Sequence, residues 1–121
     1  MRITPEGAAK YWAHPSQRQD GGLPDWAAYY AQDGVCIMLH PMPGAGVFMA
    51  HIGVEPSAWG HVTQPCKALL AEAMADLGAE RFVTWIDENN RAVVALCRRI
   101  GAELDGRLPL ASPVLMYGWR P

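Results

Sequence analysis

Three short apolar runs follow one another in the first half of the chain, at 26–32, 35–40 and 47–54. Each run is rich in aromatic or branched side chains and is bounded by turn residues, which is typical of strands. Asp33-Gly34 lies between the first two runs, and this pair tolerates the positive φ that a tight hairpin turn needs. We predict a three-stranded meander, although the alanines of 26–32 leave a helix possible for that run.

The first residues of the chain predict a short helix. Thr4 can cap it, Pro5 suits the first helical position, and His14-Pro15 closes it. The segment that follows, 15–25, is polar and rich in turn residues. We therefore predict a surface loop there.

From Cys66 the apolar positions change to a helical period. Six apolar side chains then lie on one face of a helix, and Gly78 follows where a C-terminal stop belongs. The six positions are 66, 69, 70, 73, 74 and 77. This pattern predicts an amphipathic helix that ends at Gly78.

The C-terminal third continues as a strand at 81–86, a helix at 90–101, and two strands at 102–108 and 114–119. A strand, a helix, a strand and a helix in succession predict a crossover unit with parallel strands. We therefore assign the chain to the α/β class with a mixed sheet. The buried stripe expected for the second helix is Val93, Leu96, Cys97 and Ile100.

Composition and charge narrow the function classes. The chain has 121 residues, of which 50% are hydrophobic and 18% charged, so we expect one folded domain over 1–121. The formal net charge is -2 and the basic residues are scattered, which argues against a nucleic-acid partner. No apolar stretch is as long as that of a signal peptide or a membrane span. The three cysteines are far apart in the sequence, which is typical of reduced thiols in a protein core. We expect a soluble, cytoplasmic protein whose oligomeric state the sequence leaves open.

Two spaced motifs resemble a known family. The first is V-x-P-x-x-x-G at Val54, Pro56 and Gly60, and the second is N-R-A-x(7)-I-G from Asn90 to Gly101. This order resembles the GCN5-related N-acetyltransferases (GNAT), and in detail the very short acetyltransferase-like proteins encoded by bacteriophages. The resemblance implies a GNAT-like mixed sheet, in which an antiparallel meander precedes the crossover, with a shortened N-terminal region. It also implies acetyl-CoA as the cofactor.

The resemblance places a cofactor loop between the third predicted strand and the first long helix. In the family this loop carries Q/R-x-x-G-x-G/A, whose backbone N–H groups bind the pyrophosphate. Here the loop reads AWGHVTQPCK, which keeps one glycine and has tryptophan where the family has arginine or glutamine. Two members have a second interpretation, because Asn90 can simply cap a helix and His61 can be an exposed loop residue. The candidate cofactor-binding residues are Val54, Trp59, Gly60, His61 and Asn90.

Acetyl transfer to an amine also needs groups that move protons. His51 lies in the strand that carries the catalytic carboxylate in many relatives, on the same face as Met49 and Gly53. If this face points to the cleft, His51 could act as the base, and if it points to the core, His51 is structural. The tyrosine that protonates the CoA thiolate in relatives is replaced by Cys97, which is either a thiol donor or an inert core residue. Tyr117 in the last strand is a possible substitute.

The sequence thus leaves three hypotheses. The first is an acetyl-CoA-dependent N-acetyltransferase that modifies an amine on a small molecule or a protein. The second is a catalytically degenerate GNAT-fold binding or assembly protein of a bacteriophage, in the host cytoplasm or the virion, with a phage or host protein as partner. The third is an unrelated small domain whose motifs match by chance. We expect most of the five tryptophans in the core, with Trp59 as a surface anchor, and predict no metal site.

Overall fold

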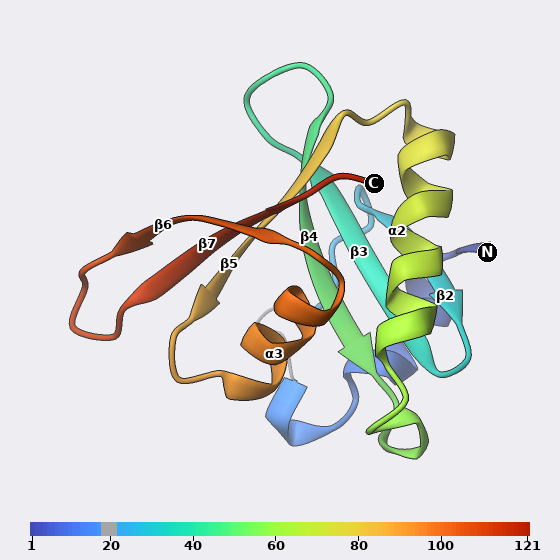
Figure 1. The fold of residues 1–121 in the computed structure, drawn as a ribbon. Coiled ribbons are helices and arrows are strands. Elements are labelled where there is room, and N and C mark those ends of the chain that lie inside the picture. The colour runs from blue at the N-terminus through green and yellow to red at the C-terminus, as the bar shows by residue number, and fades with distance from the viewer. Residues whose placement is uncertain (18–21) are drawn as a thin grey trace.

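The computed structural model describes residues 1–17 and 22–121, and these residues form one seven-stranded mixed sheet with helices on its faces (Figure 1). The strand order is β1-β2-β3-β4-β5-β7-β6. The strands are β1 (Arg2–Ile3), β2 (Ala28–Gln32), β3 (Val35–Pro41), β4 (Val47–Val54), β5 (Arg81–Asp87), β6 (Glu103–Leu108) and β7 (Val114–Trp119). The α-helices are α1 (Pro5–Ala8), α2 (Thr63–Leu77) and α3 (Arg91–Arg99), and three 3-10 turns lie at η1 (Ala9–Trp12), η2 (Pro15–Gln17) and η3 (Pro56–Ala58).

The meander is confirmed, with β2, β3 and β4 paired antiparallel. The run at 26–32 forms a strand over Ala28–Gln32, and its hairpin turn has positive φ at both Asp33 (51°) and Gly34 (79°). The two-residue β1, which pairs with β2, was not predicted. Residues 18–21 of the predicted loop lie outside the described part of the chain.

The two long helices also agree with the pattern that predicted them. α2 ends at Gly78, whose φ of 63° is the left-handed conformation that stops a helix. α3 is capped by Asn90, whose side chain accepts a hydrogen bond from the backbone N–H of Val93. Two of the four expected stripe residues of α3, Leu96 and Cys97, are buried, whereas Val93 and Ile100 are half-buried. The buried face of α3 also includes Val94, which was not expected there.

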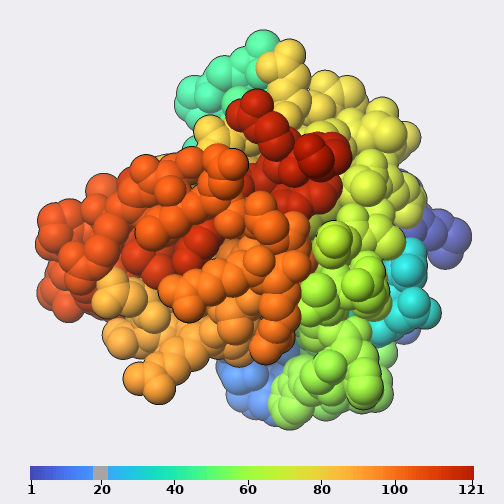
Figure 2. All heavy atoms as spheres, viewed as in Figure 1, coloured from blue at the N-terminus to red at the C-terminus, as the bar shows by residue number. Residues whose placement is uncertain are grey.

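α2 and α3 cover the same face of the sheet. Leu69 and Leu70 of α2 and Leu96 of α3 belong to one buried cluster, which also contains Phe82 of β5 and Trp119 of β7. In Figures 1 and 2 the two helices lie on the viewer's side of the strands. This shared core holds α3 next to α2 over the middle of the sheet.

The N-terminal segment covers the opposite face of β2, β3 and β4. Tyr11 and Trp12 pack there with Tyr29 and Met38 in a second buried cluster. The Trp12 ring lies so close to β4 that a Cβ atom at Gly53 would be 2.5 Å from Trp12 Cδ2. Only glycine at this position lets the indole rest on the strand backbone.

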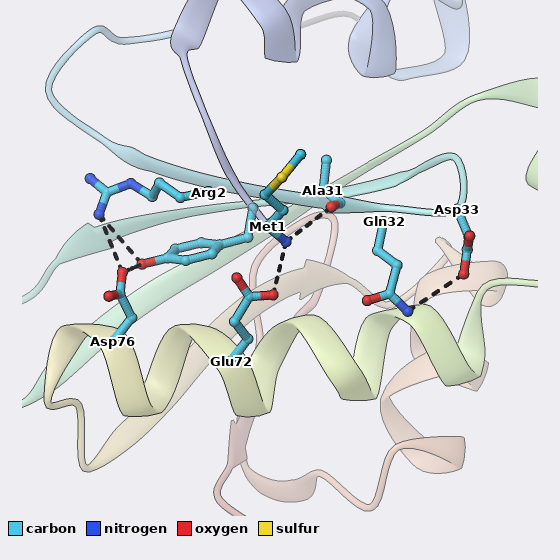
Figure 3. Close-up of polar contacts among 8 residues, drawn as sticks. Met1, Arg2, Ala31, Gln32, Asp33, Glu72 and Asp76 are labelled. Carbon is cyan, nitrogen blue, oxygen red and sulfur yellow. Dashed lines mark hydrogen bonds and ion pairs between the residues drawn. The ribbon is translucent and has the colours of Figure 1, made fainter.

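Polar contacts align the first two strands with α2 (Figure 3). The N-terminal amino group donates to the Glu72 carboxylate at 2.8 Å and to the Ala31 carbonyl oxygen at 3.1 Å. The Tyr30 hydroxyl donates to the Asp76 carboxylate, and Arg2 Nη1 lies 3.5 Å from the same carboxylate. Burial and the hydrogen bond to Asp76 raise the pKa of Tyr30 to about 12. The charged pairs are solvent-exposed, so they set alignment more than stability.

The central feature for function is the divergence of β4 and β5. These strands are parallel and pair only over Val47–Met49 and Arg81–Val83. Beyond these residues they separate, as Figure 1 shows, and α3 lies in front of the widening gap. The remaining five residues of β4, from 50 to 54, have no partner in β5.

Candidate functional site

A cavity of about 750 Å³ lies where β4 and β5 have separated. Its walls come from four parts of the chain: the end of β4, the loop before α2, one side of α3, and the N-terminal segment. In Figure 2 the N-terminal segment (blue) is visible between α3 (orange) and the loop before α2 (green). A site built from four segments can hold an extended ligand along several walls.

Four of the five predicted cofactor-binding residues line this cavity together. They are Val54 at the end of β4, Trp59 and Gly60 in the loop, and Asn90 at the start of α3. His61 instead lines a neighbouring hollow of about 590 Å³ on the outer side of the loop, with Gly60 between the two. The loop therefore presents Gly60 to both hollows and His61 to the smaller one alone.

The loop before α2 has an open backbone. Gly60 has a φ of 86°, and a Cβ atom there would meet nothing within 4 Å. α2 begins after Val62 without any side-chain cap, so the N–H groups of its first turn are not used by a capping side chain. Such a helix start attracts anions through its N–H groups and dipole. Pro65 reduces this effect by one N–H group.

Charge distinguishes the cavity from the outer hollow. Among the described residues that line the cavity, Arg99 of α3 is the charged side chain, and none is a carboxylate. The outer hollow is lined by Asp33 and Glu55. An anionic group is therefore favoured in the cavity and disfavoured beside His61.

The free end of β4 is occupied by a side chain of the N-terminal segment. Gln17 Nε2 donates to the Val54 carbonyl oxygen at 2.7 Å, and the Val54 N–H donates to Gln17 Oε1 at 2.8 Å. Gln17 is half-buried and lines the cavity. A single carboxamide thus satisfies both backbone groups that β5 would have bonded in a continuous sheet.

Trp12 also lines the cavity, and it is only 5% exposed. Its Nε1 is buried and has no hydrogen-bond partner among the described residues. Buried indole N–H groups usually find an acceptor, because an unpaired one costs free energy. The unpaired Nε1–H of Trp12 therefore costs free energy in this structure.

His51 lies on the same face of β4 as Met49 and Gly53, as the alternation predicts. Its Nε2 is 3.1 Å from Nε2 of His40 on β3, and the two rings stack with centroids 5.2 Å apart. Burial lowers the pKa of His51, and the nearby His40 lowers it further, which favours a neutral imidazole. The side chain is half-buried and is not among the residues that line the cavity.

The two candidate proton donors lie in the core. Cys97 is 4% exposed and Tyr117 is 3% exposed, and both belong to the cluster between α3 and β7. Burial raises the pKa of the Cys97 thiol to about 11. Neither residue is among those that line the cavity. This placement favours the structural interpretation of Cys97.

Sequence reasoning missed Gln17, Trp12 and His40 as site residues. Gln17 fell in the segment read as a surface loop, Trp12 was assigned to the core, and no pattern marked His40. The prediction that most tryptophans are core residues was wrong: Trp12 and Trp119 are buried, whereas three others are at least half exposed. The exposed ones are Trp26 (66%), Trp59 (51%) and Trp85 (54%).

No cluster of three or more His, Cys, Asp or Glu side chains among the described residues is arranged to hold a metal ion. No helix in the described part of the chain combines the length and apolarity of a membrane span. The cysteines Cys36, Cys66 and Cys97 are buried free thiols.

The structure of this chain is similar to several solved protein structures. No protein-family model matches the chain, and no curated protein matches it. An acetyltransferase of the GNAT family from Streptococcus pneumoniae matches with a TM-score of 0.67 at 13% identity, covering 98% of each chain. The apo ribosomal L7/L12 α-N-protein acetyltransferase RimL matches with a TM-score of 0.66 at 19% identity, covering 79% of this chain and 61% of that chain. The microcin C7 self-immunity acetyltransferase MccE, in complex with acetyl-CoA and AMP, matches with a TM-score of 0.62 at 17% identity, covering 78% and 60%.

These likenesses establish the fold. The chain has the GNAT fold, with the mixed sheet that the resemblance implied and one additional strand, β1. It spans 57% of the length of a Bacillus anthracis GNAT acetyltransferase and 61% of RimL, so it corresponds to a little more than half of these proteins.

Proposed function

We propose that this protein is a GNAT-type N-acetyltransferase that binds acetyl-CoA in the cavity between β4 and α3. The observation that carries the proposal is the convergence of Val54, Gly60 and Asn90 on one cavity at the point where parallel strands separate. Val54 and Asn90 are 36 positions apart in the chain, and Gly60 lies between them in the sequence. The GNAT fold of the solved neighbours supports the same assignment, since RimL is known in complex with coenzyme A and MccE in complex with acetyl-CoA.

The chemistry of the walls fits the parts of such a cofactor. Phosphate groups suit the part of the uncapped α2 start that lines the cavity, at Val62 and Thr63 beside Gly60, where backbone N–H groups and the helix dipole favour negative charge. Arg99 adds a cation at the same cavity. Amide groups of an extended arm suit the end of β4, where the backbone of Val54 is not bonded to β5. The cofactor supplies an activated acetyl thioester for transfer to an amine.

His51 is the residue that we propose as the base. An attacking amine must lose a proton, and a neutral imidazole can accept it at neutral pH. The lowered pKa of His51 supports the neutral form, and His40 lies within hydrogen-bond distance to orient the ring. The sheet face that carries His51 also carries Trp85 of β5, which is 54% exposed, so this face has room for an acceptor. His51→Ala should lower transfer while leaving cofactor affinity unchanged.

No direct proton-donor role is proposed for Cys97, because its thiol is buried away from the cavity lining and its pKa is raised to about 11. Tyr117 is buried in the same cluster and is likewise outside the cavity lining, so no direct donor role is proposed for it either. Tyr117→Phe removes the hydroxyl with little change in volume, and this variant should keep both its turnover and its affinity for acetyl-CoA.

Calorimetric titration with acetyl-CoA and CoA tests the proposal. The blocking variant is Ala92→Trp, because Ala92 is an exposed helical residue that lines the cavity. The matched control is Ala75→Trp, which adds the same side chain to an exposed position of α2 away from the cavity lining. We expect micromolar binding in the native and control proteins and its loss in Ala92→Trp. No binding to folded native protein at millimolar ligand would contradict the proposal.

A second candidate is a catalytically degenerate GNAT-fold protein that binds or assembles with a protein partner. Two observations favour it: the Gln17 side chain already fills the end of β4, and Trp26, Trp59 and Trp85 are exposed. The bacteriophage setting rests on the sequence resemblance alone. Absence of cofactor binding, together with a partner interaction that Trp59→Ala abolishes, would favour this candidate over the enzyme.

A further inference from the structure

The Gln17 contact has the geometry of a ligand contact. Its carboxamide oxygen faces the Val54 N–H at 2.8 Å and its nitrogen faces the Val54 carbonyl oxygen at 2.7 Å. Both distances are short for N–H···O hydrogen bonds, and 37 residues separate the two partners. An amide group from elsewhere thus occupies the place of a neighbouring strand.

The Val54 backbone faces the cavity because of strand alternation. The Glu55 N–H donates to the Gly34 carbonyl oxygen at 2.9 Å, so the backbone groups of Glu55 point toward β3. The backbone groups of the preceding residue therefore point the other way, toward β5. β5 has diverged by this level, since its last pair with β4 is Met49 with Val83. Any chain that lies along β4 in the cavity must compete with Gln17 for Val54.

Trp12 supplies an independent observation at the same place. Its ring rests on the backbone of Gly53, the residue next to Val54, and its Nε1–H is buried without a partner among the described residues. Such a donor is stabilised when an acceptor reaches it. A carbonyl oxygen on a chain held at Val54 is an acceptor of the right kind. The orphaned donor points to a group that the free protein lacks.

At the amide subsite proposed above for the Val54 backbone, we infer that the Gln17 carboxamide is an internal competitor of the ligand and that Trp12 Nε1–H is a further donor to it. The ligand class is an extended chain with a secondary amide, and this inference rests on the proposed function because acetyl-CoA has such an arm. On binding, the ligand amide replaces Gln17 at the Val54 backbone, and a ligand carbonyl oxygen accepts from Trp12 Nε1–H. Gln17 weakens ligand binding, whereas Trp12 strengthens it.

The two residues therefore predict opposite changes in CoA affinity. Gln17→Ala removes the competing carboxamide, so CoA should bind about 5- to 50-fold more tightly. Trp12→Phe keeps an aromatic ring over Gly53 and deletes the N–H, so CoA should bind about 5- to 10-fold more weakly. Gln32→Ala is the matched control, because Gln32 is exposed at the end of β2 and outside the cavity lining. Its affinity should equal that of the native protein.

The experiment is calorimetric titration of the four proteins with CoA, with hydrogen exchange of the Val54 amide measured by NMR. Without CoA, exchange at Val54 should be faster in Gln17→Ala than in the native protein, and CoA should slow it in both. This exchange readout reports the Gln17 contact even when no ligand is bound. Unfolding curves confirm that each variant is folded.

The outcomes separate this inference from the proposed function. CoA binding that is equal or weaker in Gln17→Ala overturns the displacement of Gln17 and leaves the proposed function standing. Unchanged affinity in Trp12→Phe removes Trp12 from the subsite. No CoA binding in any of the four folded proteins contradicts the proposed function and this inference together. Opposite changes in the two variants, with an unchanged control, support the subsite.

Discussion

Gly53→Ala should destabilise the protein by forcing Trp12 away from β4. The added Cβ would lie 2.5 Å from Trp12 Cδ2, 2.6 Å from Cε2 and 2.8 Å from Cε3. The indole would have to withdraw by roughly 1 Å to regain ordinary van der Waals contact. Trp12 cannot do so freely, because it is 5% exposed and packs edge-to-face on Tyr29 with ring centroids 6.3 Å apart. Overpacking of this kind costs about 1–3 kcal/mol.

The measurement is urea-induced unfolding followed by circular dichroism, with Gly106→Ala as the control. Gly106 is also a strand glycine, but its nearest obstacle is the terminal methyl of Met116 at 2.7 Å, which can rotate away. We therefore expect a change within about 0.5 kcal/mol for the control. Equal unfolding free energies for the two variants would refute the packing of Trp12 on Gly53, and with it the N-terminal wall of the cavity.

Three further predictions use the local chemistry. Asn90→Ala should lower the free energy of unfolding by about 1 kcal/mol through loss of the α3 cap, measured by thermal unfolding, and Asn90→Asp should restore most of it. The folded-state pKa of His51 should be below 6.5 by NMR titration and should rise in His40→Gln; an unchanged value in that variant would contradict the pairing. A lowered folded-state pKa means that the unfolded protein binds a proton at His51 more readily than the folded protein does. The contribution of His51 to the free energy of unfolding is therefore complete above pH 6.5 and declines as the pH falls below it. Unfolding free energies measured over a range of pH test this. The three buried cysteines should not react with a thiol reagent at pH 8 until denaturant is added, and rapid labelling of native protein would contradict their placement.

The parts of the fold set by neighbouring residues were predictable from the sequence. The Asp33-Gly34 turn determines the first hairpin, and the apolar period with Gly78 determines α2. The candidate site residues Val54, Gly60 and Asn90 came from the resemblance to the GNAT family, whose motif positions they match. α3 differed slightly because Val93 lines the cavity, so an apolar side chain there is not fully buried.

The parts set by contacts between distant segments could not be predicted. Gln17 meets Val54 across 37 residues, and a polar residue in a turn-rich segment gives no signal of its partner. Trp12 on Gly53 is likewise a contact between separate elements. The pairing of His40 with His51 depends on the register of β3 and β4, which the five-residue connection between the two strands determines.

The most direct test of the account is to map the amide NMR shifts of the native protein during titration with CoA. The account predicts that the shifts concentrate at Val54, Gly60, Thr63 and Asn90, around the cavity between β4 and α3. Shifts confined to the opposite face around Trp85, or no shifts at millimolar CoA, would contradict a cofactor site in this cavity.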